Sequence, residues 1–71
     1  MLPLTLANIG EENVIKKIGG NPAMKKHLEN LGLTVNSDIT VLSKSGGSVI
    51  CLVKEGRLAL DSGLVTKIFV S

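Results

Sequence analysis

One short helix with clear start and stop signals, expected over residues 22–31, is the most constraining feature of this 71-residue chain. Asn21 can cap the first turn through its side-chain oxygen, and Pro22 fits the first helical position because its missing N–H costs nothing there. Apolar residues follow at i, i+4 and i+7 and therefore share one face: Met24, Leu28 and Leu31. Gly32 can adopt the left-handed conformation that ends a helix, so we expect Leu33 to fold back on Leu28 in a Schellman motif.

Short strands with tight turns account for most of the remaining sequence. β-branched and apolar residues predict strands over residues 14–18, 39–44, 49–54, 57–60 and 67–70. Gly46-Gly47, within the turn Ser45–Ser48, is the strongest hairpin signal, because glycine tolerates positive φ. We expect a second tight turn at Glu55-Gly56, and Asp61 can cap a single helical turn through Leu64 and Val65.

About five short strands in a single domain of residues 1–71 predict a mainly β fold. Such strands favour a small, partly closed barrel, which leaves few exposed strand edges. The segment Leu4–Ile9 is expected to tuck against this body as an irregular arm. The strand Val49–Val53 is apolar on both faces. One face must line the core, and the other is either covered by the helix and the arm or left open for a partner.

Composition argues against several classes of function. The net charge is only +2, and Phe69 is the single aromatic residue, so the chain lacks the basic surface and stacking side chains of most nucleic-acid binders. The lone Cys51 suits a reducing compartment. The N-terminus does not resemble a signal peptide, and the longest apolar run, Val49–Val53, is far too short to span a bilayer. We therefore expect a cytoplasmic protein that does not insert into a membrane.

No catalytic or metal-binding pattern is evident in the sequence. The potential metal ligands lack the spacing of a metal site: His27, Asp38, Cys51, Asp61 and the glutamates. Cys51 lies within an apolar strand, which predicts a buried thiol and not a nucleophile. No acid–base pair or phosphate-binding loop can be assembled. We expect no cofactor, no metal and no enzymatic activity.

Three segments, in this order, resemble the ferrous iron transport protein A (FeoA) family. They are Gly19-Gly20 followed by the helix that ends Leu31-Gly32-Leu33, then residues 38–42 (Asp-Ile-Thr-Val-Leu), then residues 56–60 (Gly-Arg-Leu-Ala-Leu). Val35-Asn36 stands where the family commonly has Pro-Gly, and asparagine also tolerates a left-handed turn.

The resemblance implies an SH3-like barrel with one inserted helix. It also implies a non-enzymatic accessory or adaptor role in ferrous iron uptake, beside a membrane permease that carries a cytoplasmic GTP-binding domain. The predicted contact surface combines the helix with nearby loop positions: Lys25, Lys26, Leu28, Glu29, Leu33 and Arg57. The alternative is a small SH3-like barrel that binds nucleic acid or another protein in a regulatory role. Weak self-association is left open.

Overall fold

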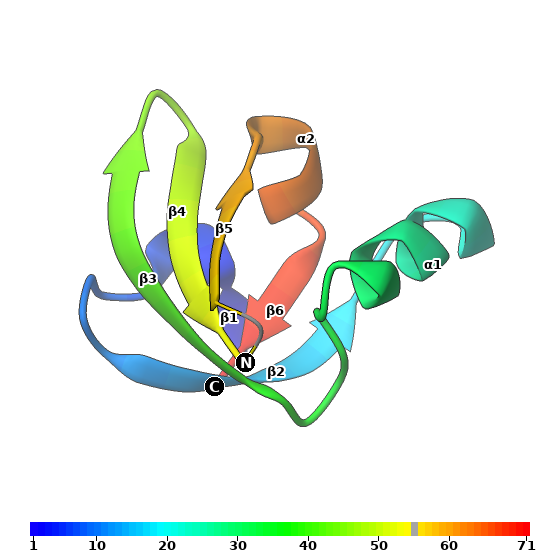
Figure 1. The fold of residues 1–71 in the computed structure, drawn as a ribbon, viewed down its shortest axis with the longest axis horizontal. Helices are drawn as coiled ribbons and strands as arrows, with labels where there is room; N and C mark the ends of the chain where they lie inside the picture. The colour runs from blue at the N-terminus through cyan, green and yellow to red at the C-terminus, as the bar shows by residue number, and fades with distance from the viewer. Residues whose placement is uncertain (55) are drawn as a thin grey trace.

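A six-stranded antiparallel sheet, curved into a partly open barrel, forms the body of the computed structural model, which describes residues 1–54 and 56–71 (Figure 1). Its strands lie in the order β1-β6-β2-β3-β4-β5. Their bounds are β1 (Leu2–Pro3), β2 (Glu12–Ile18), β3 (Asp38–Ser45), β4 (Ser48–Val53), β5 (Gly56–Leu60) and β6 (Ile68–Val70). The mainly β, partly closed barrel predicted from the sequence is confirmed.

Strand β2 joins the two parts of the sheet. Its first half pairs with β3, where Glu12 lies opposite Thr40, and its second half pairs with β6, where Lys17 lies opposite Phe69. The register shifts between Ile15 and Lys17 as the strand passes from one partner to the other. A bulge of this kind bends a strand and increases its twist, which is how a single sheet can curve into a barrel.

The β3–β4 hairpin turns where the glycine pair predicts. Gly46 and Gly47 have φ values of 56° and 85°, and positive φ at both central residues is the requirement of a type I′ turn. The predicted Glu55-Gly56 turn includes Glu55, which lies outside the described residues.

The N-terminal segment is more regular than expected. Leu2 and Pro3 pair with β6 as a sixth strand, and Leu4–Leu6 forms a 3₁₀ helix, η1. The predicted tucking of Leu4–Ile9 is confirmed for Leu4 and Ala7, which are buried, whereas Leu6 and Ile9 are 68% and 59% exposed. A two-residue strand has no periodicity of its own, so only its pairing with β6 defines it.

The predicted helix is α1 (Pro22–Asn30), and its ends are built as expected. The Asn21 side chain accepts a hydrogen bond from the Met24 backbone N–H at 2.8 Å. At the other end, the Gly32 N–H donates to the Glu29 carbonyl and the Leu33 N–H donates to the Leu28 carbonyl, at 2.9 and 3.0 Å. These two bonds define a Schellman motif. The single turn α2 (Ser62–Val65) is capped by Asp61, as predicted.

Among the described residues, the core contains fourteen apolar side chains, contributed by every strand except β1, by both helices, by η1 and, at Ala7 and Leu33, by connecting segments. Alternate residues of β4 enter it: Val49, Cys51 and Val53. The intervening Ile50 and Leu52 are 43% and 45% exposed. The second apolar face of β4 is therefore left open, which was one of the two arrangements that the sequence allowed.

Candidate partner interface

Helix α1 projects from one end of the barrel (Figure 1). Leu28 is its only buried residue, while Met24 is partly buried against the core. The remaining residues of α1 are exposed. The helix thus packs on the barrel through a narrow apolar stripe, and most of its surface is exposed to solvent.

A shallow hollow of about 370 Å³ lies between α1, the end of β2 and the segment that follows the helix. We call it the helix hollow, and its lining residues are Ile18, Lys25, Glu29, Leu33, Thr34 and Val35. Val35 is 51% exposed, and Ile18 is partly buried against the core. Lys25 and Glu29 are one helical turn apart, so opposite charges flank an apolar hollow.

The first turns of α1 carry basic charge. Lys25 and Lys26 are both exposed, and no acidic residue lies in the first turn. Positive charge near a helix N-terminus opposes the helix dipole and costs a few tenths of a kcal/mol for each residue. The two lysines therefore do not contribute to helix stability, and their exposed position suits contact with an acidic surface.

The structure separates the six residues predicted to form the contact surface. Lys25, Glu29 and Leu33 meet at the helix hollow, and Lys26 lies exposed on the same helix. Leu28 and Leu33 are both 0% exposed and belong to the core, and Leu33 also lies at the floor of the helix hollow. Arg57 is exposed on β5 and does not line the helix hollow.

The potential metal ligands are dispersed. His27 is exposed on α1, Asp61 caps α2 and Asp38 begins β3. Within residues 1–54 and 56–71, no three His, Cys, Asp or Glu side chains lie close enough together to hold a metal ion.

Cys51 is an internal thiol. It is 0% exposed, and its Sγ lies 3.5 Å from the carbonyl oxygen of Leu58 on the neighbouring strand. Burial disfavours the charged thiolate and raises the pKa of Cys51 from 9.0 to about 11. The predicted buried thiol is confirmed, and this cysteine is protonated at neutral pH.

Residues 2–71 match the FeoA domain family. The chain belongs to this family. A protein of Methanocaldococcus jannaschii named "Putative Fe(2+) transport protein A" is 34% identical to this FeoA domain over 70 residues, which is 99% of this chain and 85% of that protein. The resemblance found in the sequence is therefore confirmed.

Solved structures agree with this assignment. A crystal structure of an iron uptake regulatory protein (FeoA) superposes with a TM-score of 0.85 at 30% identity, covering 99% of this chain and 93% of that one. A manganese-dependent transcriptional repressor superposes with a TM-score of 0.86 at 20% identity. That match covers 96% of this chain but 39% of the repressor, and it shows a shared fold alone.

The turn at Val35-Asn36 contains the left-handed residue that the sequence allowed. Asn36 has a φ of 75° and is the one non-glycine residue with positive φ among those described. Its backbone N–H donates to the Ile15 carbonyl at 2.7 Å, and the Ile15 N–H donates to the Ser37 carbonyl at 2.9 Å. The turn thereby pairs with β2, as the tolerance of asparagine for this conformation predicts.

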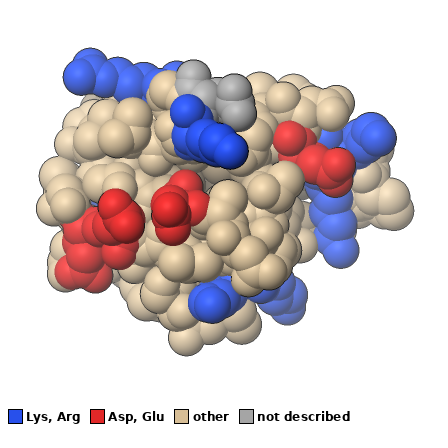
Figure 2. Space-filling view, turned by 60° about the horizontal axis from the view of Figure 1, so that its bottom comes forward, with Lys and Arg blue, Asp and Glu red and all other residues tan. Residues whose placement is uncertain are grey.

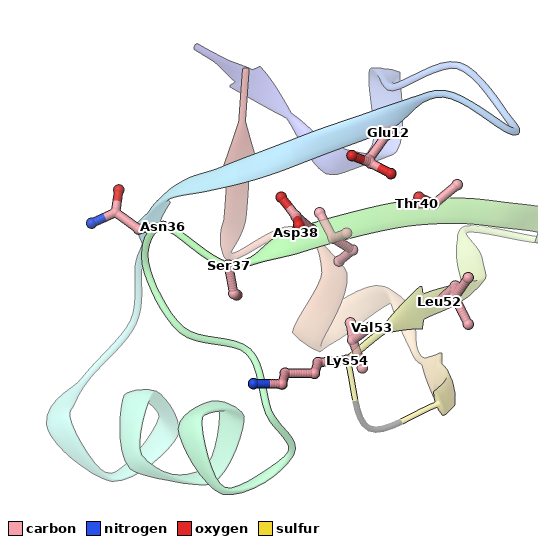
Figure 3. A pocket seen from close by; sticks show the side chains of 9 residues that line it. Glu12, Asn36, Ser37, Asp38, Thr40, Leu52, Val53 and Lys54 are labelled. Atoms are coloured by element: carbon pink, nitrogen blue, oxygen red, sulfur yellow. The ribbon is translucent and has the colours of Figure 1, made fainter.

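A second and larger groove, of about 610 Å³, was not identified from the sequence (Figure 3). It lies over β3 and the end of β4, with Glu12 at one margin and Lys54 at the other. One feature of the sequence could have pointed to this groove. The strand Val49–Val53 is apolar on both faces, and its outward-facing Leu52 lines the groove.

In the described part of this FeoA domain, no helix is both long and apolar enough to cross a membrane.

Proposed function

We propose that this FeoA domain is a non-enzymatic, cytoplasmic accessory protein of ferrous iron uptake. In this proposal it binds the GTP-binding domain of a membrane ferrous-iron permease through the helix hollow and the exposed side of α1. The observation that carries the proposal is the projecting helix with an apolar hollow and a charged rim, in a chain that matches the FeoA family over residues 2–71.

The arrangement suits recognition of a protein surface. Protein interfaces commonly have an apolar centre and a polar rim. Here Val35 and Ile18 provide apolar area, and Lys25 and Glu29 provide the charged margin. The lysines Lys25 and Lys26 would attract an acidic partner surface and increase the rate of encounter more than the final affinity.

An amide-NMR titration tests the proposal directly. The isotope-labelled FeoA domain is titrated with the purified GTP-binding domain of the permease. We expect localised shifts over residues 18–35, which contain the helix hollow. Shifts that avoid this region, or no shifts at concentrations near 1 mM, would contradict the proposed contact.

Charge reversal supplies the second arm of the experiment. Lys25→Glu combined with Lys26→Glu is expected to weaken binding roughly tenfold, because it reverses the rim charge that faces the acidic partner. The helix itself should persist, since glutamate near a helix N-terminus is favoured by the dipole. Lys44→Glu is the charge control, because Lys44 is an exposed lysine at the far end of β3. This change also removes the hydrogen bond from its Nζ to the Thr5 carbonyl oxygen, so circular dichroism checks that the control variant is folded. Equal affinity for the double variant and the control would remove α1 from the interface.

A further inference from the structure

A row of four side chains crosses the outer face of the sheet from β2 to β5. The register places Glu12 opposite Thr40, Thr40 opposite Leu52, and Leu52 opposite Arg57. Directly opposed residues of neighbouring antiparallel strands point to the same face. With about 4.8 Å between strands, the row extends roughly 14 Å from its acidic end to its basic end.

A second pair of charges repeats this polarity. Asp38 lies two residues before Thr40 on β3, and Lys54 lies two residues after Leu52. Because β3 and β4 are antiparallel, both lie on the same side of the row, and both line the groove (Figure 3). We call this surface the groove face, and its residues are Glu12, Asp38, Thr40, Ile50, Leu52, Lys54 and Arg57.

The groove face is apolar at its centre and charged at its margins. Ile50 and Leu52 are 43% and 45% exposed, and the four charged residues are all exposed. Figure 2 shows acidic side chains at the left and centre of one face, basic side chains above and below them, and a further acidic group beside basic ones at the right. On the groove face, the acidic residues belong to β2 and β3, and the basic residues belong to β5 and to the position that follows β4.

We propose that two copies of this chain associate through the groove face, around a two-fold axis that runs parallel to β3 and β4 and between them. A two-fold interface uses the same patch on both subunits, so the patch must be complementary to itself. Rotation about this axis places Glu12 over Arg57 of the second copy and Asp38 over its Lys54. The same rotation places Leu52 over Thr40 of the second copy, next to that copy's own Leu52.

The charge pattern also favours this two-fold axis over a second one, which lies in the same face but runs perpendicular to the strands. An axis perpendicular to the strands, along the row, would place Glu12 over Glu12 and Arg57 over Arg57. Like charges in an interface disfavour association, whereas the parallel axis forms two acid–base pairs in each half of the dimer. The inference is independent of the proposed permease contact, since no residue of the helix hollow belongs to the groove face.

Sedimentation equilibrium of the purified chain, in low salt and at protein concentrations up to about 1 mM, tests the proposal. We expect a reversible monomer–dimer equilibrium whose association constant falls as salt is raised, because exposed charge pairs are screened. An acid-reversed variant (Glu12→Lys with Asp38→Lys) and a base-reversed variant (Lys54→Glu with Arg57→Glu) should each associate at least tenfold more weakly than wild type. Lys44→Glu, outside the groove face, is the charge control.

Mixing the two reversed variants restores the acid–base pairs that each variant alone lacks. The acid-reversed face carries only basic charge and the base-reversed face only acidic charge, so all four pairs form in the mixed dimer. We expect the mixture to associate more tightly than either variant alone, and Leu52→Ser to weaken wild-type association without unfolding the barrel.

Three outcomes would overturn the proposal: a strictly monomeric wild type, a dimer insensitive to both reversals, and a mixture that does not associate. Groove-face amide shifts caused by the permease domain, in a wild-type chain that stays monomeric, would instead assign this face to that partner. Shifts confined to residues 18–35 would leave the permease contact in place whatever the oligomeric state, so the two proposals can fail separately.

Discussion

Leu33 folds back over Leu28: its backbone N–H donates to the Leu28 carbonyl oxygen at 3.0 Å, and both side chains are completely buried. The pair joins a projecting helix to the core of the barrel. Because the remainder of α1 is exposed or only partly buried, the orientation of the helix hollow depends on these two leucines. The proposed recognition surface and the core are therefore linked through one helix terminus.

Leu28→Ala is expected to destabilise the protein by about 2–4 kcal/mol, because it removes a fully buried side chain and leaves a cavity. Leu31→Ala is the matched control, since Leu31 is only partly buried and should cost less. Urea denaturation of both variants measures the difference. Equal losses would contradict the role of Leu28 as the anchor of α1.

Gly32→Ala should cost about 1 kcal/mol, because Gly32 has a φ of 92° and a side chain is strained in that conformation. Gly19→Ala provides the comparison, since Gly19 is outside the positive-φ region and an added Cβ would meet the Lys67 carbonyl oxygen only at 3.7 Å. The free energies of unfolding from denaturant titrations check this. A Gly32 variant as stable as the Gly19 variant would show that the Schellman motif does not require glycine.

Asn36→Gly is expected to raise the melting temperature, and Asn36→Ala to lower it. The left-handed conformation at φ 75° suits glycine best, asparagine less and alanine least. We expect alanine to cost about 1 kcal/mol relative to asparagine. Thermal unfolding followed by circular dichroism ranks the three residues, and any order in which alanine exceeds asparagine would contradict the argument.

Cys51 should make stability fall at alkaline pH. Burial raises the pKa of its thiol from 9.0 to about 11, so above pH 9 the unfolded chain loses this proton while the folded protein keeps it. The stability that the protonated thiol contributes is fully present below pH 9. Between pH 9 and 11 the free energy of unfolding falls by up to about 1.4 kcal/mol for each pH unit.

Cys51→Ala isolates this contribution, because the variant keeps every other titrating group. The difference in unfolding free energy between wild type and variant should shrink between pH 9 and 11. Native Cys51 should also resist thiol reagents at pH 8 and react only after denaturation. Rapid labelling of the folded protein would show that the thiol is accessible.

Local signals predicted the local structure well. The cap at Asn21, the stop at Gly32, the turn at Gly46-Gly47 and the cap at Asp61 each depend on interactions within a few residues, so the sequence carries them directly. The apolar neighbours of Cys51 likewise predicted its buried thiol.

Long-range register could not be predicted in the same way. β1 exists only because Leu2 and Pro3 pair with a strand more than sixty residues away. The row from Glu12 to Arg57 depends on the pairing of four strands and on a register shift between Val41 and Ser43. Leu28 and Leu33 were assigned to a contact surface that combined the helix with nearby loop positions, whereas the structure buries both side chains in the core.

The division of β2 between two partners has a consequence for how the chain is made. Its second half, together with β1, pairs only with β6, at residues 68–70. During synthesis, both N-terminal segments emerge from the ribosome long before the strand that completes their hydrogen bonds. The β3–β4–β5 meander can form first, but the barrel can close only after β6 has been synthesised. Substitutions in β6 should therefore impair folding yield in cells more than its length of three residues suggests.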